Sequence, residues 1–379
     1  MKAKRLLCLV AAAAAMASAS IPAASASEYR GIPLGFDTEA LAMALIEAQT
    51  GAVLESQNAD SPLPMASTTK IMTALVVLEN CALDELVEVG SAAVGVEGSS
   101  IYLALGERVS VRDLLYGLML ASGNDAAVAL ACHTAGSAED FAMLMNEKAR
   151  KLGLSSTHFV TPNGLTAPGH HTTAYELCLI AREALKNEYF REIVSTRYYT
   201  TTTGDHPRTF KNKNSLLWDY EGAVGVKTGY TEAAGRCLVF AAEREGMTVI
   251  GVLLNCRPMF EKAALLLDLA FDNYALCPVI LPGVPLTNIK IENSMQSILA
   301  VGAKNSIMTV MQKDESACFS AKVRLLPVTA PVARGQTVGE IIVYRDGEPV
   351  GGSELVALEP AEARGLSYWF SVLTALFVA

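Results

Sequence analysis

The chain has 379 residues and a formal net charge of −9, with 30 Lys and Arg against 39 Asp and Glu. A chain of this length usually forms two domains, one of them large enough to bury a substantial core. No stretch concentrates positive charge in the way that binding to nucleic-acid phosphates requires, so we expect no nucleic-acid partner.

Residues 1–26 have the pattern of a secretory signal peptide. A basic start precedes an apolar run from Leu6 to Met16, and an Ala-x-Ala cleavage pattern ends at Ala26. The alternative is a membrane-spanning helix, but the apolar run is too short to cross about 30 Å of hydrocarbon. We therefore expect export and removal of this segment, so that the mature chain works outside the cytoplasm.

The cysteines that follow this leader are odd in number, so at least one has no intrachain partner. They are scattered, and no Cys-x-x-Cys pair indicates a redox or zinc site. Most have apolar neighbours, as Cys178 and Cys237 do, which predicts small core residues and not a disulfide framework. The seven positions are Cys81, Cys132, Cys178, Cys237, Cys256, Cys277 and Cys318.

The first elements predicted in chain order are two short strands within 40–55, joined at Thr50-Gly51. Ser67 then opens an apolar run with helical spacing that continues to Asn80, which places Ser67 at or near a helix N-terminus. The later predicted helices cover 110–151, with a polar break at 122–124, and 173–185, after a loop rich in Pro, Gly and Asn at 161–169.

The second half of the chain changes from helices to strands. Three strands at 223–228, 236–243 and 248–255, separated by Gly-containing turns, predict an antiparallel meander, and an amphipathic helix at 260–274 closes the domain. From 277 to 358 only short alternating runs occur. The fold class predicted is therefore an α+β domain over 27–276, followed by a small β-sandwich over 277–358 that holds no catalytic constellation.

The last segment, 359–379, carries no charge after Arg364. The uncharged part as a helix would span roughly 22 Å, short of the ~30 Å hydrocarbon core. Ser367, Ser371 and Thr374 would share one face, and the aromatic residues 368–370 suit the headgroup boundary. We expect an anchor on the membrane surface; the alternative is a final helix packed on the protein's own core.

Three short clusters carry the predicted chemistry: Ser-Thr-Thr-Lys at 67–70, Ser-Gly-Asn at 122–124 and Lys-Thr-Gly at 227–229. In this order they match the S-x-x-K, S-x-N and K-T-G set of penicillin-recognising serine enzymes. Ser-x-x-Lys alone is expected about once by chance in such a chain. The set is specific because its parts fall at a predicted helix start, an interhelical loop and a strand.

The clusters contain what nucleophilic catalysis by serine needs. A serine hydroxyl is a poor nucleophile unless a base takes its proton, and Lys70 lies three residues after Ser67 on the same helix face. For that role the pKa of Lys70 must fall by several units, through burial and a nearby positive charge that Lys227 can supply. Backbone N–H groups at the start of the Ser67 helix are directed toward a developing oxyanion.

The other cluster residues complete the predicted site. Ser122 can bridge the two amines and relay a proton to the leaving group, while Asn124 can hold an amide of the substrate. The strand from Lys227 to Tyr230 offers main-chain partners to an extended peptide.

Each of these residues also has a structural alternative. Ser67 could cap a helix, Lys70 could be solvated, Ser122 and Asn124 could satisfy helix ends, and Lys227 could protect a strand edge from aggregation. We favour catalysis because the three clusters occur together.

The chain resembles the low-molecular-mass penicillin-binding proteins of the serine D-alanyl-D-alanine carboxypeptidase family, peptidase family S11, over about 40–358. The resemblance implies a β-lactamase-like domain of five antiparallel strands flanked by helices, then a β-sandwich stalk and a membrane-binding tail. It is carried by five stretches, which are 64–75, 121–130, 158–165, 212–218 and 225–231.

The resemblance also implies hydrolysis of the terminal D-alanyl-D-alanine bond of peptidoglycan stem peptides, and acylation by β-lactams, without metal or cofactor. The implied roles are nucleophile for Ser67, base for Lys70, the second edge of the site for Ser122 and Asn124, contact with the substrate carboxylate for Lys227, Thr228 and Gly229, and oxyanion donor for the backbone N–H of Tyr230. Arg257, and also Lys213, are basic candidates for the same carboxylate.

Three other functions compete with this interpretation. A β-lactamase shares the clusters, but its E-x-x-L-N deacylation pattern does not occur here. A penicillin sensor would need spanning helices to carry its signal inward. A zinc peptidase lacks suitable ligand spacing, since His170 and His171 are adjacent and would point apart, so we expect loop histidines. Carboxypeptidase, endopeptidase and transpeptidase action share one acyl-enzyme and stay open.

Overall fold

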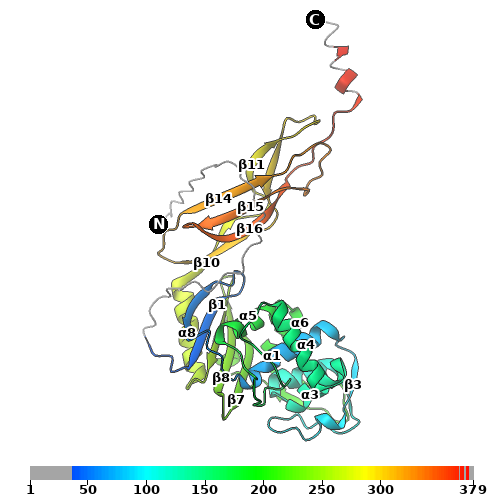
Figure 1. Ribbon diagram of the computed structural model, residues 1–379, viewed down its shortest axis with the longest axis vertical. Coiled ribbons are helices and arrows are strands. Elements are labelled where there is room, and N and C mark those ends of the chain that lie inside the picture. Colours follow the sequence, from blue (N-terminus) through cyan, green and yellow to red (C-terminus); the bar gives the residue numbers. More distant parts are fainter. Residues whose placement is uncertain (1–35, 367, 371–372, 375–379) are drawn as a thin grey trace. The chain divides into compact units, whose positions relative to one another are not determined.

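The computed structural model describes residues 36–366, 368–370 and 373–374. The chain divides between Asn273 and Tyr274 into two compact units, which are drawn in Figure 1. The predicted signal peptide lies outside the described residues.

A five-stranded antiparallel sheet in the order β2-β1-β9-β8-β7 forms the centre of the first unit (Figure 1). The hairpin of β1 and β2 confirms the two predicted early strands, and β7, β8 and β9 confirm the meander. Register pairs Leu45 of β1 with Gly251 of β9, which joins the start of the domain to its end. The strands are β1 Ala42–Glu47, β2 Val53–Gln57, β7 Ala223–Thr231, β8 Gly235–Arg244 and β9 Met247–Leu254.

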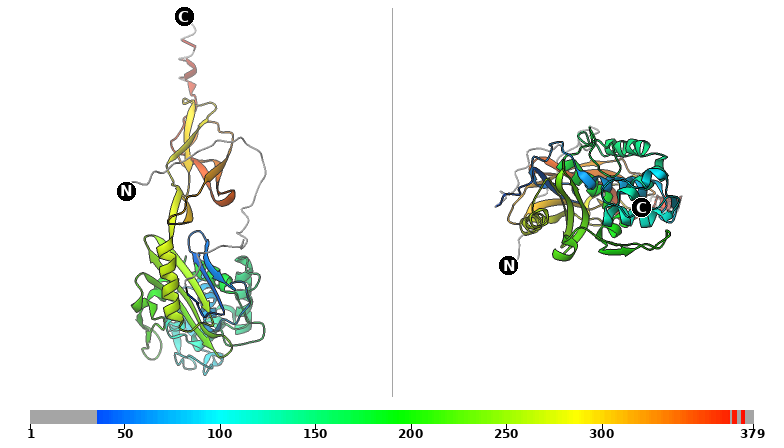
Figure 2. Two further views of the ribbon diagram at one scale, coloured as in Figure 1. Left: turned by 90° about the vertical axis from the view of Figure 1, so that its left-hand side faces the viewer. Right: turned by 90° about the horizontal axis from the view of Figure 1, so that it is seen from below.

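Helices cover both faces of this sheet, which is why β1, β8 and β9 are nearly continuous apolar runs. Helix α8, Met259–Asn273, packs on β8 and β9, and α5, Ala174–Ala184, packs on β1 and β9 from the other side (Figures 1 and 2). Helix α1, Lys70–Asn80, is buried from Lys70 through Val77, so it is the internal helix of the domain.

Side-chain oxygens cap several helices, as the sequence favours. Ser110, Ser137 and Thr173 precede helices and accept hydrogen bonds from backbone N–H groups three residues later. Helix α1 contacts α3, Asn124–Ala135, and α4, Ala138–Lys151. Helix α2, Val111–Tyr116, precedes them in the chain.

The stretch 186–222 contains elements that the sequence did not predict. They were missed because each is too short for a clear period: α6 buries only three residues of a single face, and the two strands have three residues each.

The predicted helix at 110–120 also changes, since Gly117–Ala121 is a π-helical turn, η3. The additional elements are α6 Glu188–Ser195, β5 Tyr198–Thr200, β6 Thr209–Lys211 and α7 Leu216–Asp219, with β3 Leu86–Glu88, η2 Ser91–Ala93 and β4 Arg108–Ser110 earlier.

The second unit is built from two antiparallel sheets, β11-β12-β16-β15-β14 and β10-β13. Their inner faces share an apolar core that includes Leu299, Ile307, Ile341 and Leu355. Together with the first unit this confirms the predicted fold class. The strands are β10 Tyr274–Ile280, β11 Pro285–Lys290, β12 Ile298–Ala303, β13 Ile307–Gln312, β14 Phe319–Leu325, β15 Thr337–Arg345 and β16 Glu348–Ala357.

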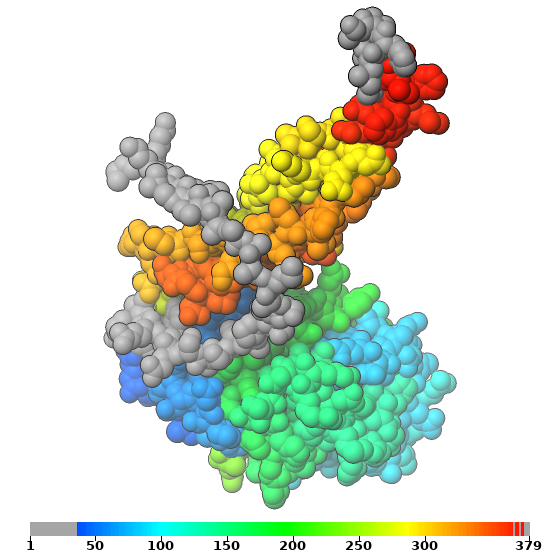
Figure 3. All heavy atoms as spheres, turned by 45° about the horizontal axis from the view of Figure 1, so that its top comes forward, coloured from blue at the N-terminus to red at the C-terminus, as the bar shows by residue number. Residues whose placement is uncertain are grey.

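The tail begins within this sandwich, where Ala361 is buried in the core and bridges to Val332. The described residues from Leu366 on project from it, as the red spheres of Figure 3 show. Leu366 is 83 % exposed and Phe370 is 70 % exposed, and Trp369 and Leu373 are exposed as well. The alternative of a tail packed on the core is therefore not observed for these residues. Within the described part of the chain, every helix is too short or too polar to cross a bilayer.

None of the described cysteines forms a disulfide bond. Cys178, Cys237 and Cys256 are buried core residues, whereas Cys318 is exposed and the other three are intermediate. The core prediction therefore holds for three of the seven.

Candidate active site

The three sequence clusters meet where the internal helix α1 begins, next to β7. Ser67 lies in a short 3₁₀ turn, η1 (Ala66–Thr69), that leads directly into α1, as predicted. This turn packs on β7, and a Cβ added to Gly229 would lie 3.1 Å from the backbone N of Ser67 and 3.2 Å from the carbonyl O of Met65. The glycine of the Lys-Thr-Gly cluster therefore allows the strand to approach the turn closely.

Ser67 is not a helix cap. The caps of η1 and α1 are Met65 and Thr69, and neither makes a side-chain capping bond. The hydroxyl of Ser67 instead lies 2.9 Å from Nζ of Lys70. The structural alternative for this serine is therefore wrong, and its hydroxyl is half-buried within reach of an amine.

Lys70 is completely buried, and its amine has three oxygen neighbours. Besides Ser67 Oγ, Nζ donates to Oδ1 of Asn124 at 2.7 Å and to the carbonyl O of Asn163 at 2.6 Å. The alternative of a solvated lysine is excluded. Burial, followed by the charges of Lys227 and Lys213, lowers the pKa of Lys70 well below its ordinary value, while Asp125 acts in the opposite direction.

Lys227 is 1 % exposed and its Nζ donates to the carbonyl O of Thr228 at 3.0 Å. Burial, with the charge of Lys213 second, lowers the pKa of Lys227 to about 7. A buried lysine inside the domain does not serve as a strand-edge charge against aggregation. The strand itself is the sheet edge, because β7 pairs only with β8 among the strands described.

Asn124 has a different set of partners from the predicted substrate amide. Its Oδ1 accepts from Lys70, and its Nδ2 donates to the carbonyl O of Glu97 at 2.5 Å. Gly98 makes this approach possible, since a Cβ there would lie 2.8 Å from Nδ2. In the structure Asn124 therefore orients Lys70 and ties the loop at 97–101 to α3.

Ser122 occupies the junction between η3 and α3 in the left-handed region, with φ 66°. It is 5 % exposed. Its hydroxyl has no hydrogen-bond partner within the described residues, so the predicted bridge between the two amines is not formed. The side chain is free to serve a bound substrate.

The basic candidates for the substrate carboxylate differ in placement. Lys213 Nζ donates to Ser99 Oγ at 3.1 Å, and its charge acts on both buried lysines. Arg257 is exposed just after β9, and among the described residues it forms no hydrogen bond or ion pair with the three clusters. Thr228 is half-buried and Tyr230 is 56 % exposed, with the guanidinium of Arg236 5.9 Å from the Tyr230 ring centre.

Two contributors from the loop at 161–169 and its end were not predicted as site residues. Asn163 supplies only its backbone carbonyl to Lys70, a role that a side-chain motif does not reveal. His170 is 7 % exposed, and burial, with smaller effects of His158 and His171, lowers its pKa to about 4, so its ring is neutral. His170 is thus a loop histidine, as expected, but its side chain is buried.

Potential metal donors gather elsewhere. The donor atoms of Cys81, Glu85 and His133 lie within 4.8 Å of one another, and Nε2 of His133 is 3.0 Å from Oε2 of Glu85. This cluster is at the end of α1 opposite Ser67. It therefore cannot contribute to chemistry at the serine.

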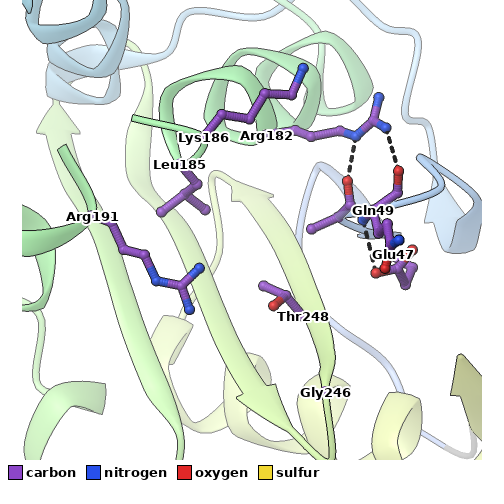
Figure 4. Close-up of a pocket in the computed structure, with 9 residues that line it drawn as sticks. Glu47, Gln49, Arg182, Leu185, Lys186, Arg191, Gly246 and Thr248 are labelled. Carbon is purple, nitrogen blue, oxygen red and sulfur yellow. Dashed lines mark hydrogen bonds between the residues drawn. The ribbon is translucent and has the colours of Figure 1, made fainter. Parts of the chain in front are cut away.

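A surface hollow beside the β1–β2 turn is shown in Figure 4. Arg182 of α5 donates from Nε to the carbonyl O of Ala48 at 2.5 Å and from Nη2 to that of Gln49 at 2.8 Å. The guanidinium therefore fastens the turn to the helix. None of the three clusters contributes to the lining of this hollow.

Comparison with known families assigns both units of the chain. A family model described as D-alanyl-D-alanine carboxypeptidase, peptidase S11, matches residues 27–257. A second model, described as the C-terminal domain of penicillin-binding protein 5, matches residues 278–363.

Individual relatives extend over most of the chain. The D-alanyl-D-alanine carboxypeptidase DacF of Bacillus subtilis is 34% identical over 86% of this chain and 87% of its own length. DacD of Salmonella typhimurium, with the same activity in its name, is 34% identical over 96% of both chains. Penicillin-binding protein 5 from Haemophilus influenzae has a similar structure, with a TM-score of 0.72 and 27% identity, over 87% of this chain and 99% of its own.

Proposed function

The chain belongs to the D-alanyl-D-alanine carboxypeptidase family, and on this premise we propose that it hydrolyses the terminal D-alanyl-D-alanine bond of peptidoglycan stem peptides through an acyl-enzyme on Ser67. The observation that carries the proposal is the environment of Lys70 Nζ. Two of its three oxygen neighbours, Asn124 Oδ1 and the Asn163 carbonyl O, can only accept hydrogen bonds, whereas the third is the hydroxyl of Ser67.

This environment suits a neutral amine. A neutral Nζ has two hydrogens, which the two acceptor oxygens take, and one lone pair, which is left for the Ser67 hydroxyl. The lowered pKa of Lys70 favours that form. Ser67 Oγ then attacks the carbonyl carbon between the two D-alanines while its proton passes to Lys70.

The backbone N–H groups of Ser67 and Tyr230 are the proposed donors to the oxyanion that forms. Lys227 and Thr228, with Gly229 between the strand and the turn, face the terminal carboxylate, and a bound carboxylate would hold Lys227 in its charged form. The substrate backbone extends along the free edge of β7.

The tetrahedral intermediate collapses by breaking the peptide bond. The leaving D-alanine takes a proton relayed from Lys70 through Ser122, and the acyl group stays on Ser67 as an ester. Water then attacks the ester and gives its proton to Lys70. Lys70 passes that proton to Ser67 Oγ as the ester bond breaks, which releases the shortened peptide and restores both the serine hydroxyl and the neutral amine. A β-lactam, with an amide near a carboxylate, acylates the same serine.

The β-lactamase and penicillin-sensor alternatives are not favoured. The relatives that span this chain are named as carboxypeptidases, and the second unit matches a penicillin-binding protein domain. Peptidoglycan lies outside the cytoplasmic membrane, so the proposed activity also requires export, for which the signal-peptide pattern at 1–26 provides.

Digestion of purified muropeptides tests the proposed reaction. Pentapeptide-bearing muropeptides should each lose one alanine, whereas cross-linked dimers should keep their cross-link. Mass spectrometry of the products distinguishes these outcomes. Cleavage of the cross-link without loss of alanine would assign the protein to endopeptidase action.

Replacing Lys227 tests its double role. Lys227→Gln removes a positive charge near Lys70, so the pKa of Lys70 rises and the acid limb of the pH–rate profile for acylation moves to higher pH. Because nearby charges usually shift a pKa by about one to three units, the rate near neutral pH should fall at least about tenfold. Lys227→Arg keeps the charge and should leave the limb in place. A rate loss in the Gln variant with an unmoved limb would restrict Lys227 to carboxylate binding.

We further propose that the tail at 359–379 binds the membrane surface, supported by its exposed apolar residues. A chain truncated after Arg364 keeps the buried Ala361 and the hydrogen bond from the Arg364 N–H to the Asn293 carbonyl. It should stay in the supernatant when lipid vesicles are sedimented, while the full chain sediments with them. The truncated protein should acylate with penicillin at the full-length rate, since the tail lies in the other unit from Ser67. Sedimentation of the truncated chain would place the anchor elsewhere.

A further inference from the structure

A buried histidine beside the nucleophile turn has a defined direction of hydrogen bonding. The backbone N–H of Val160 donates to Nδ1 of His170 at 2.9 Å, so Nδ1 carries no hydrogen. In the neutral ring the hydrogen is therefore on Nε2. Nε2 lies 2.8 Å from Oγ1 of Thr69 and donates to it.

Thr69 connects His170 to Ala66, the residue before Ser67. Its Oγ1 donates to the carbonyl O of Ala66 at 2.8 Å, so the hydroxyl both accepts and donates. Ala66 has φ 48°, a left-handed conformation that alanine seldom adopts. The loop at 161–169 also approaches the same carbonyl closely, since a Cβ added to Gly164 would lie 2.0 Å from it.

The Ala66 carbonyl and the Ser67 N–H are the two ends of one planar peptide group. Any force that fixes the direction of the carbonyl therefore fixes the direction of the N–H. On the other side this N–H is backed by β7, where Gly229 approaches the Ser67 nitrogen. The peptide group between Ala66 and Ser67 is thus held between β7 on one side and the hydrogen bonds from His170 through Thr69 on the other.

We infer that His170 is a positioning residue for acylation, which acts through Thr69 to aim the Ser67 N–H at the oxyanion. The inference rests on the proposed acyl-enzyme function of Ser67. Removal of an entire oxyanion donor typically lowers the rate 10²- to 10³-fold. Loss of its alignment should therefore lower the acylation rate constant by about tenfold.

Replacing His170 with Asn or with Gln tests the roles of its two ring nitrogens separately, because each amide side chain can replace a different nitrogen. In His170→Asn the short amide can still accept from Val160 but does not reach Thr69, whereas the amide nitrogen of His170→Gln reaches the position of Nε2. With the full chain and a fluorescent penicillin, stopped-flow kinetics separates noncovalent affinity from the acylation rate constant. We expect the Asn variant to lose rate with its affinity little changed, and the Gln variant to recover most of the rate.

A neighbouring histidine and a double variant complete the test. His171→Asn, in the same loop but outside the chain of contacts, should acylate at the original rate. Thr69→Val breaks the same series of hydrogen bonds. The losses of acylation rate in Thr69→Val and His170→Asn should therefore not add when the two substitutions are combined. Full additivity, or an unimpaired His170→Asn, would overturn the inference while labelling of Ser67 in the unaltered protein upheld the proposed function. Absence of that labelling would overturn both.

Discussion

Ser67→Ala should reduce the release of D-alanine from pentapeptide muropeptides to the uncatalysed background. The methyl group cannot form an ester, so neither substrate nor penicillin can acylate the protein. Because Ser67 caps no helix, the variant should keep its thermal unfolding temperature. The measurements are D-alanine release, gel fluorescence after incubation with a fluorescent penicillin, and a thermal melt.

Ser137→Ala is the matched control for this variant. Ser137 caps α4 with its side chain, which accepts from the N–H of Asp140. Its loss should cost about 1 kcal/mol of folding stability and leave acylation unchanged. If Ser67→Ala instead destabilised the protein while retaining label, Ser67 would be structural and another serine would carry the chemistry.

Lys70→Arg should lower acylation by about 10²- to 10⁴-fold, the range typical for loss of a general base. A guanidinium keeps its proton throughout the accessible pH range, so it cannot accept one from Ser67. The neutral form of Lys70 depends on its lowered pKa. The unaltered protein should therefore gain rate as pH rises through that pKa, whereas the variant should show no such acid limb.

The contrast between the two pH profiles is the informative result. Lys148→Arg is a suitable control, because Lys148 pairs with Glu79 and Glu183 and contacts none of the three clusters, so it should not affect the profile. Rapid acylation by Lys70→Arg, with an acid limb like that of the unaltered protein, would remove Lys70 from the base role.

Much of the site was predictable because its residues are local in sequence. Helical periodicity places Ser67 at the start of α1 and Lys70 one turn later, and the polar break at 122–124 falls between apolar helices. Alternation predicts β7 with its Lys-Thr-Gly cluster. These patterns depend only on short segments, which the tertiary structure then leaves intact.

What the sequence did not predict depends on contacts between distant segments. The Asn163 carbonyl reaches Lys70 across 93 positions, and any residue type offers a carbonyl. The pairing of Asn124 with Lys70 and Glu97 was not predicted, because it depends on how α3 meets α1 and the loop at 97–101. The sheet order, with β1 between β2 and β9, was not predicted either, because the apolar pattern of a strand does not show which distant strand pairs with it.

Mass spectrometry of the quenched reaction tests the central claim most directly. The full chain is mixed with penicillin, or with a D-alanyl-D-alanine peptide, stopped in acid within the first turnover and digested for peptide mapping. One acyl group should be found per chain, on Ser67, with one equivalent of D-alanine released in the peptide reaction. An adduct on another residue, or D-alanine release without any covalent adduct from either compound, would contradict the Ser67 acyl-enzyme.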